Sequence, residues 1–316
     1  MRRWFTGVLP WLLVSPWVVW AIVRLGGWDK GYPATQLIAF TPYVAATAVI
    51  PLATVLLMRR WWAAGLAGVI VLVLAWCVLP RWIPDGDARA GAHGPTLKVM
   101  TANVLGGTAS PDELVRLVRE NGVDILAVQE LTPAFVDRAK AAGLEELMPH
   151  QVLYPKRSVI GSGIYSRLPL GHGELRSNPG GFGQARAEVI QYGLWVESVH
   201  PDAPAESARI DAWVGSFANQ HAATPDGPMQ VLAGDFNATL DHSVLRSLIS
   251  TGYRDAADVV GKGFIGTWGP YDGDRIPPVT LDRVLADKRI GVADIHVFDL
   301  QGSDHRPVMA TLILPG

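Results

Sequence analysis

Residues 231–237 read Val-Leu-Ala-Gly-Asp-Phe-Asn, an apolar run that closes on a glycine and two polar side chains. The run from Met229 to Ala233 is short, apolar and free of proline, as expected of a buried strand. Asp235 and Asn237 follow it directly. A strand end holds a side chain more rigidly than a loop tip, which suits a preorganised site. The stretch therefore predicts a central strand that presents a carboxylate and a carboxamide at its end.

Polar and ionisable residues recur where other apolar runs begin or end. Each alone has an ordinary explanation as a turn or cap residue. Together they are only carboxylates, carboxamides and imidazoles, the groups that bind cations and move protons. They are Asn103 after LKVMTA, Glu130 after DILAVQ, His200 after LWVESV, Asp282 within TLDRVLA, and Asp304 and His305 before PVMATLIL. The pattern predicts one site assembled from several strand ends.

The segments between these residues alternate between strand and helix patterns. Ser110 precedes a helix expected over 111–121, with Pro111 at its first position and Gly122 after its end. The apolar run 123–128 reads as a central strand covered on both faces. Several strands follow one another without a helix between them, which favours two packed mixed sheets over a simple βαβ wheel. We therefore expect an α/β sandwich with helices outside the sheets.

Charge is distributed unevenly along the 316 residues. The first 84 residues carry only eight charged side chains, whereas from Thr96 onward 19 Lys and Arg face 26 Asp and Glu, a net formal charge of −7. The single cysteine, Cys77, excludes an internal disulfide. We expect an apolar membrane region over 1–83, a flexible Pro/Gly/Ala-rich linker over 84–95, and a globular catalytic domain over 96–316.

Three apolar stretches, 8–25, 36–58 and 61–80, are expected to form membrane helices. A cleaved signal peptide is the alternative for the first stretch. Two arginine pairs, Arg2–Arg3 and Arg59–Arg60, place the N-terminus in the cytoplasm and the catalytic domain outside the cell membrane. If the first stretch does not cross, both ends of the region lie on the same side.

The residue types suit the hydrolysis of a phosphoester. That reaction requires neutralising the phosphate, activating water and stabilising the leaving oxygen. Mg²⁺ prefers oxygen ligands, so Glu130 is the leading metal ligand, with Asn103 and Asp304 as further candidates. The expected catalytic groups are Asp235 as the proton acceptor, Asn237 to orient water or phosphate, His200 and His305 as donors to phosphoryl oxygens, and Asp282 to orient an imidazole.

These residues lie in motifs whose order resembles the endonuclease/exonuclease/phosphatase superfamily. The motifs are NVLGG, VQELT, GIYSR, SVHPDAP, GDFNA, TLDRVL and GSDHRPV. The resemblance covers Leu97 to Leu314 and implies a four-layer α/β sandwich with Mg²⁺ or Mn²⁺. It also implies that Glu130 is the metal ligand of the QE motif, and that Asp235, Asn237, Asp304 and His305 belong to the active site.

The resemblance departs from the superfamily pattern at two places. His200 lies in VHPDAP rather than in a His-Thr-His run, and Arg283 replaces a frequent histidine after Asp282. The membrane-plus-domain layout is similar to membrane-anchored bacterial members, among them a type associated with teicoplanin resistance. Trp268 is expected either to pack beneath the loop 261–273 or to line the cleft.

The choice of substrate rests on charge and on the membrane region. A domain with net charge −7 lacks the basic footprint of duplex nucleic-acid binders. A lipid-linked or cell-envelope phosphate at the bilayer is therefore the expected substrate, and no obligate protein partner is expected. Nuclease activity is the alternative, because Arg167 and Arg186 can approach the cleft. A catalytically silent binding module is a third reading, opposed by a complete set of catalytic positions.

Overall fold

The computed structural model describes residues 7–269 and 275–316. Arg2, Arg3 and the segment 270–273 of the expected loop lie outside the described residues. The chain divides into two compact units. We call Met1–Pro80 with Leu240–Ser243 the helical unit, and Arg81–Thr239 with Val244–Gly316 the α/β unit.

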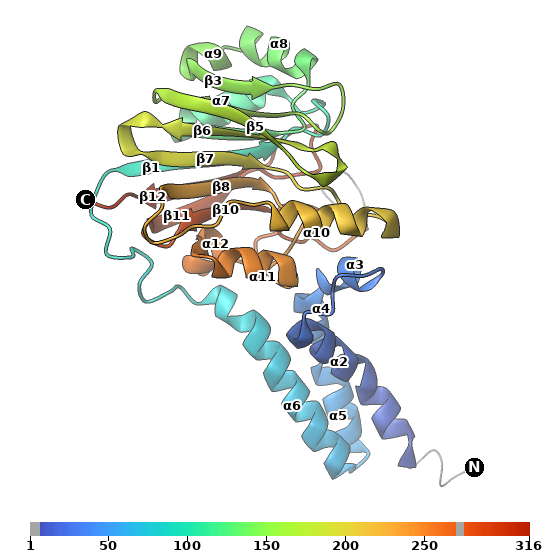
Figure 1. Cartoon of the computed structure of the whole chain (residues 1–316). Helices are drawn as coiled ribbons and strands as arrows, with labels where there is room; N and C mark the ends of the chain where they lie inside the picture. Colours follow the sequence, from blue (N-terminus) through green and yellow to red (C-terminus); the bar gives the residue numbers. More distant parts are fainter. Residues whose placement is uncertain (1–6, 270–274) are drawn as a thin grey trace. The chain divides into compact units, whose positions relative to one another are not determined.

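Two six-stranded sheets form the centre of the α/β unit (Figure 1). Both are mixed, because β1 pairs parallel with β2 and β7 with β8, while their other pairs are antiparallel. The first sheet has the order β11 (Gly291–Val297), β12 (Val308–Ile313), β1 (Thr96–Asn103), β2 (Ile125–Gln129), β4 (Ser162–Ser166) and β3 (His150–Tyr154). The second has the order β5 (Leu170–Ser177), β6 (Gly183–Val189), β7 (Leu194–Val199), β8 (Met229–Asp235), β10 (Asp282–Asp287) and β9 (Tyr253–Asp255).

Alternation along β1 shows how the layers are made. Leu97 and Val99 are buried between the sheets, together with Val196 and Val231 of the second sheet. Met100 and Ala102 belong to a separate buried cluster that includes side chains of the helices outside the first sheet. Successive side chains of a strand point to opposite faces, so β1 is covered on both. The expected sandwich of two mixed sheets flanked by helices is confirmed.

Helices cover the sheets from outside. The cluster behind the first sheet includes side chains of α7 (Pro111–Asn121), α8 (Pro133–Ala141) and α9 (Leu144–Leu147) (Figure 1). The helices of the C-terminal half are α10 (Ile210–Ala218), α11 (Ser243–Ser250) and α12 (Ala256–Val259). Trp213 of α10 packs edge-on against Phe217, 5.4 Å between centroids, and its indole donates to the carbonyl of Asn237 at 3.2 Å. Helix α10 therefore stabilises the loop that follows β8.

The segment expected to be a flexible linker, 84–95, is fixed to the α/β unit. The backbone N–H of Asp85 donates to Val259 O at 2.8 Å, and that of Gly94 donates to Leu314 O at 2.9 Å. Arg254 also pairs with the Asp85 carboxylate at 3.1 Å. Composition alone suggested mobility, but these bonds to distant strands and helices order the segment. The second unit accordingly begins at Arg81.

Among the residues that the structure describes, two helices of the helical unit are long and apolar enough to cross a membrane, Leu9–Gly26 and Trp61–Trp82. Only 22 % and 33 % of their apolar windows are buried, whereas the core helix of a soluble protein is mostly buried. The expected middle span, 36–58, is divided into the end of α3 (Ala34–Ile38), then α4 (Thr41–Thr47) and α5 (Val49–Leu57). Its apolar helical part, Thr41–Leu57, is shorter than those two helices.

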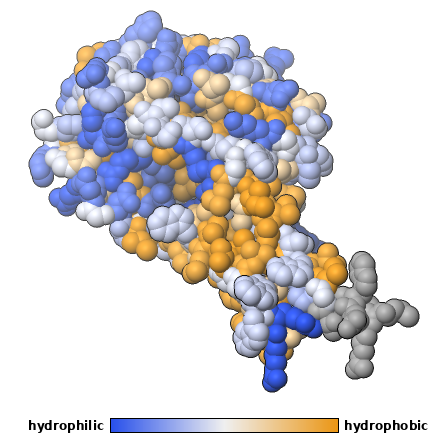
Figure 2. Space-filling view, turned by 60° about the horizontal axis from the view of Figure 1, so that its bottom comes forward, coloured by the Kyte–Doolittle hydropathy of each residue, from blue (hydrophilic) through white to orange (hydrophobic). Residues whose placement is uncertain are grey.

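Small side chains let these helices approach one another. Ala63, Ala64 and Ala67 of α6 (Trp61–Val78) are buried against Val14 of α2 (Leu9–Gly26) and Val55 of α5. The outward faces of the same helices carry exposed apolar residues, such as Leu57 at 86 % and Trp76 at 81 % exposure. Figure 2 shows hydrophobic residues gathered on the helical unit. Such a surface requires an apolar environment or a partner.

Candidate active site

Strand pairing brings the predicted residues to one edge of the α/β unit. In the first sheet, Asn103 at the end of β1 pairs with Gln129, so Glu130 follows at the same edge. In the second sheet, Asp282 at the start of β10 pairs with Asp235 at the end of β8. Parallel pairing in one sheet and antiparallel pairing in the other thus place four acidic or amide side chains together.

Asn103 joins the two sheets at this edge. Its Nδ2 donates to Glu130 Oε1 and to Asp235 Oδ2, both at 3.1 Å. Asn103 and Asp235 are each only 1 % exposed. A single carboxamide therefore fixes one carboxylate from each sheet in a buried position.

Glu130 is held in an uncommon backbone conformation. Its φ is 59°, in the left-handed region that non-glycine residues rarely adopt. The second carboxylate oxygen, Oε2, accepts the N–H of Gly106 at 2.6 Å. Such strain costs on the order of 1–3 kcal/mol and persists where surrounding structure requires it. In this backbone conformation the Glu130 carboxylate contacts Asn103 Nδ2 and the N–H of Gly106.

Asp282, His305 and Asp235 form a chain of proton-moving groups. His305 Nδ1 lies 2.8 Å from Asp282 Oδ2, and its Nε2 lies 3.6 Å from Asp235 Oδ2. Burial lowers the pKa of His305, but the carboxylates of Asp282 and Asp235 outweigh burial and raise the pKa above its ordinary value. Hydrogen bonding to Asp282 fixes the ring orientation. The arrangement can hold and transfer a proton at Nε2.

His200, which directly follows β7, faces the same carboxylates. Its Nε2 lies 3.7 Å from Asp235 Oδ2 and 4.0 Å from Glu130 Oε1. Phe182 packs edge-on against the ring at 4.9 Å, and the backbone N–H of His200 donates to Gln184 Oε1 at 3.1 Å. Burial lowers the pKa of His200, opposed by Asp235 and Glu130. A neutral imidazole at this position can donate a hydrogen bond to a substrate oxygen.

Asn237 orients Asp235 through the backbone of a tight turn. The φ of Asn237 is 47°, and its N–H donates to Asp235 Oδ1 at 2.8 Å. Its side-chain amide donates to the carbonyl of Pro201 at 3.2 Å. Gly234 is required just before, because a Cβ there would lie 1.9 Å from the carbonyl oxygen of Val199. The GDFN run thus sets the direction of the Asp235 carboxylate.

Asp304 is the last predicted residue of the cluster. It accepts a hydrogen bond from Trp268, whose role the sequence left open. Trp268 Nε1 donates to Asp304 Oδ2 at 3.0 Å, and Asp304 Oδ1 lies 3.9 Å from His305 Nε2. Thr267, which sequence reasoning missed, accepts the backbone N–H groups of Leu281 and Asp282 at 3.0 and 2.9 Å. The sequence Thr267–Trp268 alone does not predict these contacts. They depend on the β-bridges that Trp268 forms with Val279 and with His305.

The donor atoms fit a hard divalent cation. Within 7–269 and 275–316, the buried Oδ1 atoms of Asp304 and Asp282 find no hydrogen-bond partner. A buried carboxylate oxygen without a donor requires a cation or ordered water. Asp235, Asp282 and His305 also have ligand atoms within 4.8 Å of one another. Within that trio, His305 Nδ1 already lies 2.8 Å from Asp282 Oδ2.

Three arginines lie away from this cluster. Arg283 pairs with Asp255 at 2.6 Å, with both side chains buried, and has a structural role. Arg186, expected near the cleft, pairs with Glu174 at 2.6 Å and lies 3.9 Å from the ring centroid of Trp195. Arg167 follows β4, whose last residue pairs with the start of β2, at the opposite end from Glu130. Antiparallel pairing of β4 therefore makes the expectation for Arg167 wrong.

The chain is similar to one described protein family and to several solved structures. The family described as "Endonuclease/Exonuclease/phosphatase family" matches residues 100–305. No curated protein matched the chain.

Several solved structures share the fold. An endonuclease/exonuclease/phosphatase from Beutenbergia cavernae is similar with a TM-score of 0.54 and 18 % identity, over 70 % of this chain and 72 % of that one. TDP2 from Caenorhabditis elegans, in truncated form, has a TM-score of 0.56 and 15 % identity, over 69 % and 98 %. The 3′ phosphatase NExo from Neisseria has a TM-score of 0.52 and 20 % identity, over 68 % and 98 %.

Proposed function

Because the chain belongs to the endonuclease/exonuclease/phosphatase family, we propose that it is a membrane-anchored, divalent-metal-dependent phosphoester hydrolase. The single observation that carries the chemistry is Asn103 bonded to both Glu130 and Asp235, with His305 3.6 Å from Asp235. Carboxylates for a cation and groups for proton transfer therefore share one buried edge.

Each side chain has a role in this proposal. Glu130, Asn103 and Asp304 hold Mg²⁺ or Mn²⁺, which when bound supplies charge neutralisation at the phosphate. Asp235 accepts the proton of the attacking water, and Asn237 holds Asp235 in position. His200 and His305 donate hydrogen bonds to the phosphoryl oxygens. Asp282 keeps the His305 ring oriented through the 2.8 Å contact.

The substrate is proposed to be a lipid-linked or cell-envelope phosphate. Two apolar helices with largely exposed faces support an anchor in the cell membrane. The net charge of −7 from Thr96 onward disfavours long polyanionic duplexes. An extracytoplasmic domain requires the shorter apolar stretch, Thr41–Leu57, to cross as a middle span, with the paired arginines before the first and third spans on the cytoplasmic side. Hydrolysis of a cell-wall lipid intermediate would make resistance to teicoplanin a consequence in cells.

Nucleic-acid hydrolysis is the second candidate. One structure of similar fold, TDP2 from D. rerio, was determined with a single-strand DNA product, at 16 % identity and a TM-score of 0.54. The same cluster of Asp235, His305 and Asp282 would serve that reaction, since the chemistry at phosphorus is shared.

A substrate panel distinguishes the two candidates. The purified full chain is incubated with Mg²⁺ or Mn²⁺ and polyprenyl diphosphate, plasmid DNA or bis-p-nitrophenyl phosphate. We expect phosphate release from polyprenyl diphosphate, reduced about 10²–10⁴-fold by Asp235→Asn. The matched control Asp299→Asn removes an exposed carboxylate paired with Arg306 and keeps full activity. Rapid DNA degradation with intact polyprenyl diphosphate would instead establish the nuclease.

A further inference from the structure

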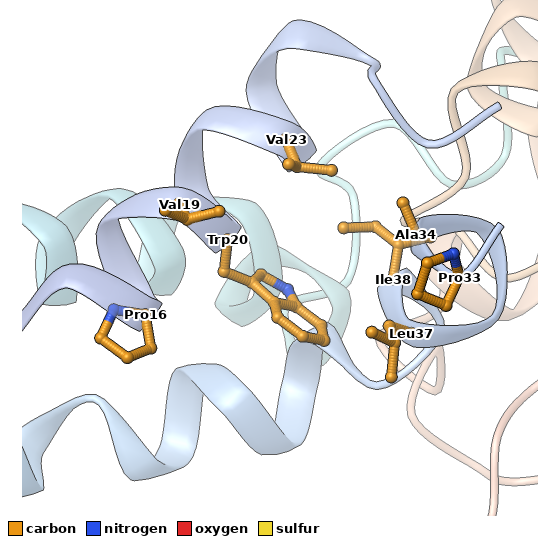
Figure 3. Close-up of a pocket in the computed structure, with 8 residues that line it drawn as sticks. All are labelled: Pro16, Val19, Trp20, Val23, Pro33, Ala34, Leu37 and Ile38. Carbon is orange, nitrogen blue, oxygen red and sulfur yellow. The ribbon is translucent and has the colours of Figure 1, made fainter. Parts of the chain in front are cut away.

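Buried polar side chains that the proposed reaction leaves unused gather around the start of β6 in the α/β unit. The pocket of about 200 Å³ in the helical unit, between α2 and α3, has a different character, because hydrocarbon and indole side chains line it (Figure 3). Such a lining offers no charge to a phosphate. Around β6, in contrast, the buried residues Asn178, Gln184 and Glu197 form hydrogen bonds with one another. These bonds lead to the active-site residue His200.

His200 differs from His305 in how its ring is held. Nδ1 of His305 lies 2.8 Å from Asp282 Oδ2. In the part of the chain that the structure describes, the buried Nδ1 of His200 has no hydrogen-bond partner. Its Nε2 lies 3.7 Å from Asp235 and 4.0 Å from Glu130, beyond hydrogen-bond reach. The direction of this ring therefore depends on the backbone that carries it and on the side chains that pack against it.

Gln184 fixes the backbone of His200. Its Oε1 accepts the N–H of His200 at 3.1 Å, and its Nε2 donates to Glu197 Oε1 at 2.5 Å. A carboxylate can only accept and a backbone N–H can only donate, so these two partners leave one orientation for the amide. The ladder between β6 and β7 ends at the pair Arg186–Glu197. Beyond that end, the Gln184 side chain supplies the acceptor for the N–H of His200.

Gln184 is itself held by several hydrogen bonds. Asn178 Nδ2 and Gln220 Nε2 also donate to its Oε1, the second at 3.1 Å. Glu197, which accepts its Nε2, also accepts Arg176 Nε at 2.8 Å. A side chain whose own orientation is fixed by such partners can hold a functional group precisely. The network around Gln184 thus makes it a rigid support for His200.

Phe182 contacts the imidazole ring of His200 directly. The two ring centroids lie 4.9 Å apart, with the planes at 89°, and Phe182 is buried. This edge-to-face arrangement is a preferred geometry for aromatic rings, so it restricts rotation of the imidazole. The backbone on either side is fixed, because Phe182 O accepts the N–H of Asn178 at 2.8 Å and the N–H of Gly183 donates to Ile160 O at 3.1 Å.

From these contacts we infer that Phe182 and Gln184 are positioning residues for His200. Gln184 fixes the backbone and Phe182 restricts the ring, so Nε2 keeps its direction without a carboxylate bonded to Nδ1. The inference rests on the proposed role of His200 as a donor to a phosphoryl oxygen, and it names the residues on which that role depends. A displacement of about 1 Å in a reacting group costs about 100-fold in rate. Loss of either support should therefore lower kcat.

A double-mutant cycle with His200 tests the inference in the full chain. The substrate is bis-p-nitrophenyl phosphate with Mg²⁺. Gln184→Met removes the amide at nearly the same length, and we expect kcat and kcat/KM to fall together by about 10–100-fold. In a chain that already carries His200→Asn, the same change should cost less than about twofold, because the group that it positions is absent. Equal losses in both backgrounds would indicate a general structural role and overturn the inference.

A second variant and a control complete the kinetic test. Phe182→Leu removes the edge contact and keeps an apolar side chain, so it should also lose kcat only where His200 is present, even if Gln184→Met fails to fold. Gln230→Met is the matched control. Gln230 is a buried glutamine on β8 of the same sheet, and its Oε1 accepts Arg186 Nη2 at 3.3 Å. This control should keep kcat within about twofold of the parent.

Nuclear magnetic resonance of the histidine rings separates this inference from the proposed function. Histidine Cε1 is isotope-labelled, and the signal of His200 is assigned by its loss in His200→Asn. We expect this signal to broaden or split in Gln184→Met and in Phe182→Leu, because the ring then adopts several orientations, and to stay single in Gln230→Met. A single sharp signal in both positioning variants overturns the inference even if the phosphoester is hydrolysed. A split signal in a protein that hydrolyses no phosphoester supports the positioning and removes the proposed function.

Discussion

At Asp282, one carboxylate oxygen orients the ring of His305 and helps raise its pKa. Asp282 Oδ2 lies 2.8 Å from Nδ1 and accepts its proton in a hydrogen bond. In Asp282→Asn the negative charge is lost, so the pKa of His305 falls, and the new amide can donate to Nδ1 of a neutral ring. We expect kcat to fall about 10²–10⁴-fold with the fold intact. Steady-state kinetics with Mg²⁺ and circular dichroism measure the two effects, and Asp299→Asn is the control. A normal kcat in Asp282→Asn would show that His305 needs no carboxylate.

The grouping of the candidate site residues could be predicted from the sequence because their side-chain types are restricted. Asn103, Glu130, His200, Asp235, Asp282 and His305 all lie in one network of contacts. Arg186 could not be placed, since its direction depends on the partner Glu174 from a neighbouring strand. Trp268 and Thr267 contact distant residues through β-bridges and a hydrogen bond, which no local sequence pattern predicts. Residue identity predicts chemistry, but contacts between distant segments decide position.

Strands β5, β6 and β7 enclose a buried ion pair that supports the site. Glu197 is 1 % exposed and accepts from Arg176 Nε at 2.8 Å and from Gln184 Nε2 at 2.5 Å. Removing one partner of a buried pair leaves an uncompensated charge and costs about 3–5 kcal/mol. We expect that loss of unfolding free energy for Arg176→Met, measured by denaturant titration.

A matched exposed pair gives the comparison for that variant. Arg116 pairs with Glu120 at 2.8 Å, with side-chain exposures of 51 % and 58 %. Exposed pairs contribute about 0–1 kcal/mol, so Arg116→Met should be nearly neutral. Equal losses of unfolding free energy for Arg116→Met and Arg176→Met would mean that the burial of Glu197 does not explain the contribution of its ion pair to stability.

Helix α12 carries a carboxylate whose ionisation opposes folding. Burial, together with Asp255, raises the pKa of Asp258 to about 6. The folded state therefore binds the proton more tightly than the unfolded state, and stability falls as the pH rises from the unfolded pKa to the folded one. Asp258→Asn should stabilise the protein by about 1–2 kcal/mol at pH 8 and have little effect near pH 4. Denaturant midpoints at both pH values test this, and a pH-independent difference would contradict it.

Local signals predicted some elements better than others. Ser110 caps α7 through the N–H of Glu113, and Gly122 ends it with a φ of 62°, as the sequence indicated. The half-buried strands β3 and β5 were not predicted, because their residues alternate poorly between apolar and polar. The sequence over 204–221 predicts one helix, but the structure is α-helical only at Ile210–Ala218, after a 3₁₀ turn at Ser207–Arg209. Capping chemistry is local, whereas edge strands depend on their neighbours.

For the whole molecule, a bound cation should couple activity to stability. In the proposed function Glu130, Asn103 and Asp304 hold the cation, and a cation that binds only the folded state stabilises it by about 2.7 kcal/mol at 100 times its Kd. Chelation with EDTA should abolish activity and lower the Tm, and Mg²⁺ or Mn²⁺ should restore both. Glu130→Gln should lose most of the Tm shift. Full activity in EDTA would exclude the proposed cation.

The two-unit organisation followed from composition, but its boundary did not. Apolar content distinguished the first 84 residues, and alternating segments indicated the sandwich. The α/β unit begins at Arg81, earlier than the expected Thr96. Pro, Gly and Ala favour loop conformations, but this composition does not predict whether the loop forms backbone hydrogen bonds. Here hydrogen bonds to Val259 and Leu314 hold it in place.

The ordered segment 84–95 also affects the sensitivity of the protein to proteases. Proteases cleave extended chain that is free of backbone partners, and here Asp85 and Gly94 donate to Val259 and Leu314. Ala92 is only 3 % exposed. Scission at this point requires local unfolding first, so shedding of the C-terminal part into the surroundings would be slow.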